Sequence, residues 1–156
     1  VTPVGLGARD TLRLEKGYLL SGQDFLWPGL GDDHVGPLPA EYLSRTTLET
    51  NIPFGLNLDH NFVGKDAMIR GKATNSLWMG LMCTGKGPSP RTGHEVHSSP
   101  VEDSLVGFVT SGAPSPSLGV GIGMAYMENV AEGDTVFIKT SPRRLIEAKV
   151  KAPPFV

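Results

Sequence analysis

The sequence is poor in cysteine, in net charge and in long apolar runs, and each shortage narrows the possible function classes. Its 156 residues include one cysteine, Cys83, so no disulfide can form within the chain and nothing argues for secretion. The net charge of −2 favours neither a nucleic-acid partner nor an anionic membrane. No apolar run approaches the roughly 20 residues that a membrane-spanning helix needs. We expect a cytoplasmic protein, and the lack of an initiator methionine and of a signal peptide suggests a piece of something longer.

Glycine and proline, in contrast, are plentiful, with 20 and 13 residues respectively. This density breaks long helices and favours short strands joined by turns. Apolar residues that alternate with polar ones, or that occupy both faces, predict strands over 77–82, 105–110, 120–126, 134–140 and 145–151. A further strand is predicted to begin at Gly93. We therefore predict that residues 73–156 form an antiparallel barrel or sandwich.

One helix is predicted near the start of the chain, over residues 8–20. Leu12 and Leu19 fall near one face at helical spacing. Gly17 is a plausible stop, because glycine readily adopts the left-handed conformation that ends many helices.

The rest of the first 72 residues is predicted to be mostly loop. Residues 21–40 hold four glycines and three prolines, and we expect Phe25 and Trp27 to anchor this loop to a surface. A short strand is expected over 53–58 and a short helix over 64–71.

Few residues outside this pattern suggest chemistry. His94 and His97 lack both helical i, i+4 spacing and a nearby cysteine pair, so an exposed strand or turn is favoured over a zinc site. Cys83 has no base beside it in sequence and is expected to be a core thiol rather than a nucleophile. The glycines of 119–126 lack the strand–turn–helix context of a dinucleotide loop, so this segment is predicted to be a strand with a crowded neighbour.

Arg9 is the remaining candidate for a ligand contact. Arg9 and Arg13 lie one turn apart on the predicted helix, and like charges at this spacing disfavour an isolated helix by a few tenths of a kcal/mol. The residues alone favour an Arg9 that pairs with Asp10 or Glu15 on a solvated helix face over one that binds a ligand.

Four segments, in order, resemble the glycine cleavage system T-protein, an aminomethyltransferase family. They are GLGARDTLRLEKGYLLSGQDF, TTLETNIPFGLNLDHNFVGKDAM, LVGFVTSGAPSPSLGVGIGMAYM and AKVKAPPFV, and they span nearly the whole chain. The chain resembles the C-terminal half of a family member. Residues 1–72 would be the closing segment of the folate-binding core, and 73–156 a six-stranded jelly-roll-like barrel. The expected fold is therefore mainly β with an α+β lead-in.

The resemblance also implies a function. The family transfers a one-carbon unit from an aminomethyl group on lipoylated H-protein to tetrahydrofolate and releases ammonia. The arginine of the family's GARD motif contacts folate, and Arg9 matches it; Arg13 is assigned no ligand. The family's catalytic aspartate lies in the N-terminal half, so we expect no catalytic residue and no metal here. The chain is expected to need the N-terminal half of the same enzyme as its partner and to be inactive alone.

Two alternatives stay open at this point. Relatives with the same folate pocket demethylate methylated amines or sulfonium compounds, and the unusual loop over 25–45 leaves the one-carbon donor undecided. Other relatives are non-catalytic folate-binding or structural domains. Those carry a K-G-C-[YF]-x-G-Q-E motif that this sequence lacks.

Overall fold

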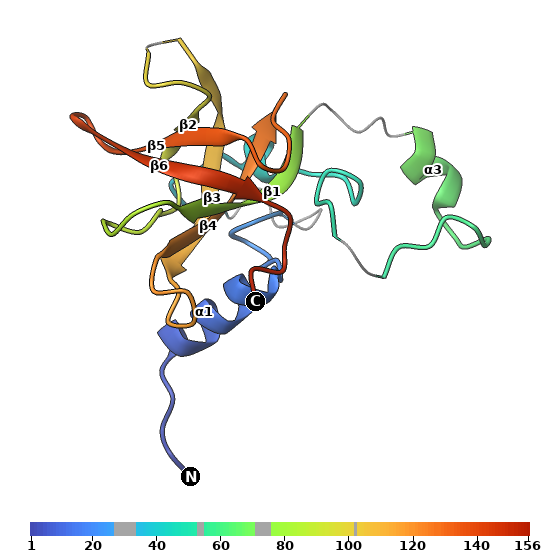
Figure 1. Ribbon diagram of the computed structural model, residues 1–156. Helices are drawn as coiled ribbons and strands as arrows, with labels where there is room; N and C mark the ends of the chain where they lie inside the picture. The colour runs from blue at the N-terminus through green and yellow to red at the C-terminus, as the bar shows by residue number, and fades with distance from the viewer. Residues whose placement is uncertain (27–33, 53–54, 71–75, 102) are drawn as a thin grey trace.

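The computed structural model describes residues 1–26, 34–52, 55–70, 76–101 and 103–156. Helices precede strands along the chain: α1 (Leu6–Lys16), α2 (Ala40–Leu43), α3 (Lys65–Arg70), β1 (Ser76–Cys83), β2 (Glu95–His97), β3 (Leu105–Pro114), β4 (Gly121–Glu128), β5 (Thr135–Ser141) and β6 (Arg144–Lys151). This order confirms a mainly β fold with an α+β lead-in (Figure 1). None of the helices in these ranges is long and apolar enough to cross a bilayer.

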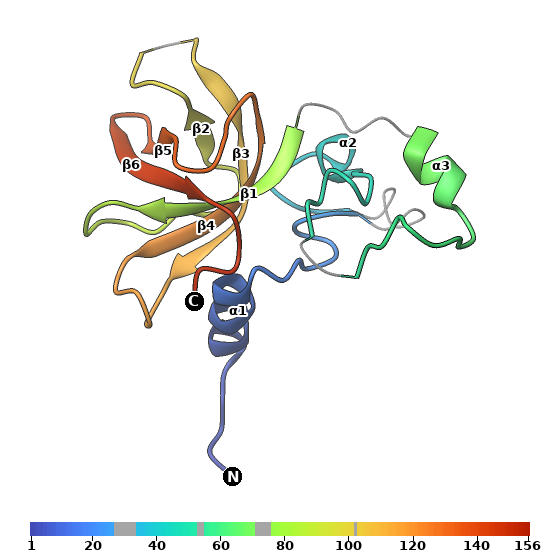
Figure 2. The same cartoon turned by 45° about the vertical axis from the view of Figure 1, so that its right-hand side comes forward.

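The six strands within the described ranges form one closed barrel in the order β1-β4-β3-β2-β5-β6. Every pairing is antiparallel, and β1 pairs with both β4 and β6, which closes the barrel. Closure leaves no edge strand with unpaired backbone groups. The predicted six-stranded antiparallel barrel is therefore confirmed. Figure 2 shows the barrel on one side of the molecule and the lead-in with α2 and α3 on the other.

The barrel interior is filled by alternate side chains of the strands. Val136 and Ile138 on β5 and Ala148 and Val150 on β6 are buried, as their alternation predicts. Each fully buried aliphatic side chain contributes about 1.5–3 kcal/mol relative to an exposed one. The interior cluster comprises Met79, Leu81, Val96, Val109, Ala125, Met127, Val136, Ile138, Ala148 and Val150.

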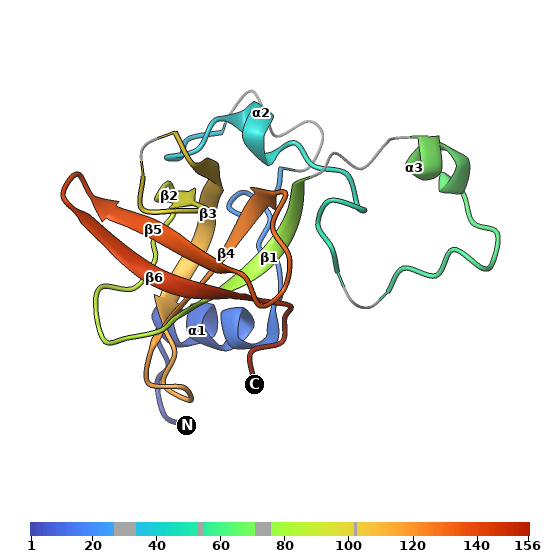
Figure 3. The same cartoon turned by 45° about the horizontal axis from the view of Figure 1, so that its top comes forward.

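A second apolar cluster lies on the outer face of the barrel, where α1 packs (Figure 3). Leu14 of α1 is fully buried against it, together with Trp78 of β1. Trp78 faces this outer cluster while Leu81 faces the interior, which explains why 77–82 is apolar on both faces. The C-terminal end also joins it: Phe155 packs here and its N–H donates to the carbonyl of Glu15 over 2.8 Å.

Helix α1 ends at Lys16, four residues before the predicted end. Gly17 adopts a left-handed φ of 73°, and the N–H groups of Gly17 and Tyr18 bond to the carbonyls of Leu14 and Arg13. The predicted stop at Gly17 is confirmed. The extension to residue 20 is wrong, because Leu19 has helical spacing but belongs to the chain after the cap.

Other boundaries differ from the predictions. The strand expected over 53–58 is wrong where it can be judged, because none of residues 55–58 belongs to a strand: Gly55 forms a bend and Leu58 a turn. Residues 53 and 54 lie outside the described ranges. The short helix near 64–71 is confirmed as α3. Trp27 and the predicted boundary after residue 72 also lie outside those ranges, so the two-part division stays a prediction.

Two glycines of the barrel strands lie where a side chain would collide with a neighbouring part of the chain. A Cβ on Gly107 would lie 1.9 Å from the carbonyl oxygen of Tyr126, and one on Gly123 would lie 2.9 Å from Cβ of Pro90. The second contact confirms that 119–126 contains a strand with a crowded neighbour.

Gly107→Ala is expected to lower the free energy of unfolding by at least about 1–3 kcal/mol, because backbone must move to admit the methyl group. Urea unfolding followed by circular dichroism would measure the change. Gly85→Ala is the matched control, since a Cβ there meets nothing within 4 Å. Equal urea midpoints for the two variants would contradict the close approach at Gly107.

Candidate functional site

The two arginines of α1 have opposite surroundings. Arg9 is exposed, and it has no hydrogen bond or ion pair with any residue that the structure describes. The pairing that the residues alone favoured is wrong, because Asp10 bonds to Arg13 and Glu15 bonds to serines of the barrel. The Arg9 guanidinium is therefore available to a partner outside these residues.

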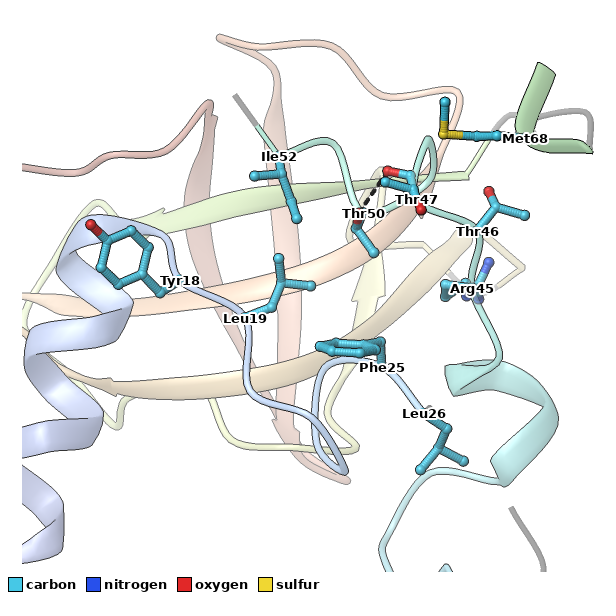
Figure 4. A pocket seen from close by; sticks show the side chains of 10 residues that line it. All are labelled: Tyr18, Leu19, Phe25, Leu26, Arg45, Thr46, Thr47, Thr50, Ile52 and Met68. Atoms are coloured by element: carbon cyan, nitrogen blue, oxygen red, sulfur yellow. Dashed lines mark hydrogen bonds between the residues drawn. The ribbon is translucent and has the colours of Figure 1, made fainter. Parts of the chain in front are cut away.

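Arg9 lines a hollow of about 470 Å³ beside α1. A second hollow of about 690 Å³ adjoins it at Tyr18 and Leu19, which line both. The second is lined by Tyr18, Leu19, Phe25, Leu26, Arg45, Thr46, Thr47, Thr50, Ile52 and Met68 (Figure 4). Together they form a largely apolar surface with the Arg9 cation at one end.

Arg45, the other arginine near this surface, is already partnered. Its guanidinium lies 4.6 Å from the ring centroid of Tyr42 and 4.4 Å from that of Tyr126. It also donates to the carbonyl of Tyr42 and forms a 3.1 Å ion pair with Glu49. Of the three arginines that line the two hollows, only Arg9 lacks a carboxylate partner among the described residues.

Arg13 is buried, with 7% exposure, although the sequence pattern did not predict a buried role for it. Its guanidinium donates to Asp10, to Asp24 over 2.7 Å and to Ser111 over 3.0 Å. It also donates to the carbonyl of Tyr18. Arg13 thus cross-links α1 to β3 of the barrel, and it cannot serve as a neutral comparison for Arg9.

Asp24 is the centre of this network and is fully buried. One carboxylate oxygen accepts from Arg13 and from the backbone N–H of Leu20, and the other accepts from the hydroxyls of Thr110 and Ser111. Such complete satisfaction is what makes a buried carboxylate tolerable. Two features of the sequence could have suggested this network. Arg13 follows the like-charged Arg9 by four residues, and the acidic Asp24 follows Arg13 by eleven.

A β-bulge in β3 explains how two consecutive residues reach the same carboxylate. The pairing with β4 shifts between Val109 and Ser111, so Thr110 is an extra residue. In a regular strand the side chains of Thr110 and Ser111 would point to opposite faces. The bulge turns both toward Asp24. Strand β3 continues past the bulge to Pro114, so its predicted end at residue 110 is wrong.

Glu15 provides a second link from α1 to the barrel. Its carboxylate accepts from the hydroxyls of Ser115 and Ser117 and from the backbone N–H of Ser117. The hydrogen bond from Ser115 is the main cause that holds the pKa of Glu15 below its usual value. The side chains of Arg13, Leu14 and Glu15 therefore fix the C-terminal half of α1 to the barrel. Bonds from Phe155 to Glu15 and from Lys16 to Val156 also join this half to the C-terminal end of the chain.

His94 and His97 each have a partner close to them in sequence. Within the described ranges, no group of three histidine, cysteine or acidic side chains could hold an ion. His97 lies 3.1 Å from the carboxylate of Glu95, and His94 accepts from the backbone N–H of Arg91. His97 lies in β2 and His94 directly precedes it, so the strand part of the interpretation is confirmed, but both side chains are half-buried rather than exposed.

The bonds of Glu95 to Lys139 and His97 predict that the folded protein loses stability in acid. Its carboxylate accepts from Lys139 over 2.9 Å, and the bonds from Lys139 and then His97 lower the pKa of Glu95 in the folded protein. A carboxyl pKa that is lower in the folded state gives stability that is present above the unfolded value, about 4.3, and is lost as the pH falls through the folded value. Below about pH 4.3, the melting temperature of Glu95→Gln should therefore decrease less steeply with falling pH than that of the unmodified protein. An unchanged slope would contradict this.

Cys83 is a core thiol, as predicted. It is buried, and burial raises its pKa to about 11. The reactive thiolate is accordingly scarce at neutral pH.

These features define a closed antiparallel barrel domain with a helix-and-loop segment fixed to its outer face. The family described as "Glycine cleavage T-protein C-terminal barrel domain" matches residues 78–156. The chain belongs to the glycine cleavage T-protein family.

Relatives over nearly the full chain agree with this assignment. A protein of Halobacterium salinarum named "Probable aminomethyltransferase" is 38% identical, and one of Thermococcus kodakarensis with the same name is 36% identical. The matches cover 99% of this chain but only 38% and 37% of those proteins. The crystal structure of the glycine cleavage system aminomethyltransferase T of Bartonella henselae matches with a TM-score of 0.64 and 26% identity, over 98% of this chain and 39% of that one. The chain thus spans less than two fifths of the length of these relatives.

Proposed function

We propose that the chain is the C-terminal part of a tetrahydrofolate-dependent aminomethyltransferase of glycine cleavage. In this reaction the aminomethyl group on lipoylated H-protein gives its one-carbon unit to tetrahydrofolate, and ammonia is released. The observation that carries the proposal is Arg9, a cation that pairs with none of the described residues and lies at one end of a largely apolar surface.

The chemistry of folate suits such a surface. Folate joins flat ring systems, which favour apolar and aromatic contacts, to a glutamate tail with two carboxylates. The guanidinium of Arg9 can pair with a carboxylate or carbonyl through two parallel N–H donors. Tyr18, Leu19 and Phe25 supply apolar and aromatic area beside it. Tetrahydrofolate, when bound, would supply the acceptor nitrogen for the one-carbon unit.

The proposal also assigns partners and a location. Exposed apolar side chains lie on and before α1, among them Val4, Leu6 and Leu12, with exposures of 73%, 84% and 64%. We propose that the N-terminal half of the same enzyme covers them and completes the folate pocket. The family assignment implies a lipoylated H-protein as the donor. The net charge of −2 and the single cysteine favour a cytoplasmic location, with neither nucleic acid nor membrane as a partner.

Arg9→Ala, made in the complete protein, tests the proposal. A charged hydrogen bond contributes about 1.5–3 kcal/mol, so the dissociation constant of tetrahydrofolate should rise about tenfold or more. An exposed side chain contributes little to stability, so the melting temperature should change little. Isothermal titration calorimetry and thermal unfolding would measure both. Arg9→Lys should rescue poorly, because lysine keeps the charge but lacks the planar fork.

The matched control is Lys16→Ala, which removes a cation from the same helix. Lys16 is exposed and lines neither hollow. Its loss should leave folate affinity near that of the unmodified protein. Equal, small effects of the Arg9 and Lys16 changes would return Arg9 to a solvated surface residue and remove the support for folate.

A further inference from the structure

We infer that Asp24 is a positioning residue: it fixes Arg13, and through Arg13 the helix that carries Arg9, at the ligand-facing surface. The inference rests on the proposed function, because it concerns how Arg9 is held at the surface proposed to bind tetrahydrofolate. It assigns Asp24 no contact with the ligand.

The first step is that, among the described residues, the contacts that fix α1 come from its C-terminal half. The contacts described above that join α1 to the barrel come from Arg13, Leu14 and Glu15. At the other end, the N-cap is Gly5, which supplies no side-chain cap, and residues 1–5 extend away from the barrel (Figure 1). The orientation of the helix at Arg9 therefore depends on the links at its far end.

The second step is that Arg13 lies on the same side of α1 as Arg9. The two are four residues apart, which makes them neighbours on one helix face, and both line the hollow of about 470 Å³. The Glu15 link acts on a different side, toward Ser115 and Ser117. Rotation of α1 about its axis is thus opposed at Arg9's side by the Arg13–Asp24 pair.

The third step is that Asp24 is itself held from several directions. It accepts from Thr110 and Ser111 of the β3 bulge and from Leu20 of the loop after α1. Thr110 in turn accepts from the indole N–H of Trp78 in β1. The carboxylate is thereby tied to the rigid barrel, and a positional error of about 1 Å at a ligand-binding group can weaken its effect greatly.

The test is a double-mutant cycle on tetrahydrofolate affinity in the complete protein. Asp24→Asn keeps the shape but replaces one acceptor oxygen by a donor that faces Arg13 or the two hydroxyls. If Asp24 acts through Arg9, Asp24→Asn should raise the dissociation constant by about fivefold in the unmodified background and by less than about 1.5-fold in the Arg9→Ala background. Calorimetry below the melting temperature of every variant would measure this.

The possible outcomes test the inference about Asp24 and the proposed function separately. An equal factor in both backgrounds would show a general structural effect and overturn the inference. No effect of Asp24→Asn, with a large effect of Arg9→Ala, would also overturn it but leave the proposed function standing. No effect of Arg9→Ala would overturn the proposed function and the inference together. If Asp24→Asn does not fold, Ser111→Ala, which removes one donor to Asp24, takes its place under the same criteria.

Discussion

Arg13→Ala is expected to lower the free energy of unfolding by about 3–5 kcal/mol, because removal of one member of a buried ion pair leaves the other charge uncompensated. Asp24 is fully buried and would lose its charged donor, and Ser111 would lose one as well. For a chain of this size, the melting temperature should fall by roughly 6–20 °C. Urea and thermal unfolding followed by circular dichroism would measure the loss.

Arg9→Ala is the matched control for stability, since it removes the same side chain one turn away from an exposed site. Its effect should stay within about 0.5 kcal/mol. Arg13→Lys should give an intermediate loss, because lysine keeps the charge but cannot bond to Asp24 and Ser111 through one planar group. Equal losses for the Arg9 and Arg13 alanine variants would show that the buried network contributes little.

The barrel could be predicted from sequence because its signal is local. In 134–140 and 145–151, apolar and polar residues alternate, and this alternation places Val136, Ile138 and Val150 in the interior. Burial of one strand face requires that pattern whatever the neighbouring strands are.

The network around Asp24 could not be predicted in that way, because its partners are far apart in sequence. Arg13 and Ser111 are separated by 98 positions, and their contact needs the β3 bulge at Thr110. No periodicity encodes a bulge, and a charged residue on a helix usually indicates a solvated face. The same rule favoured a surface pair for Arg9, whereas the family resemblance placed Arg9 at the ligand.

The structure brings two of the resembling segments together. Arg13, Glu15 and Asp24 belong to the first, and Ser111 and Ser115 belong to the third. Each of these three charged groups of the first segment bonds to at least one hydroxyl group of the third. The barrel therefore has a role in the proposed function, because it supports the helix that holds Arg9.

The second large effect concerns catalysis: the 156-residue chain, assayed alone, is expected to show no measurable aminomethyl transfer. In the described part of the chain, no aspartate, glutamate or histidine lines either hollow. A general acid or base contributes about 10²–10⁴-fold, and the positioning of reactants can contribute more. Tetrahydrofolate-dependent release of ammonia from aminomethylated H-protein would measure the rate, with the complete protein as the reference.

Addition of the N-terminal half as a separate polypeptide is the control for a misfolded sample. If this half supplies the catalytic carboxylate and most folate contacts, the mixture should recover turnover. Recovery should also be weaker with Arg9→Ala in the 156-residue chain than with Lys16→Ala, since Arg9 lines one of the hollows and Lys16 lines neither. Turnover by the chain alone at a rate near that of the complete protein would mean that its own residues carry the chemistry. A base would then have to be sought beyond the two hollows, and the role given to the N-terminal half would be wrong.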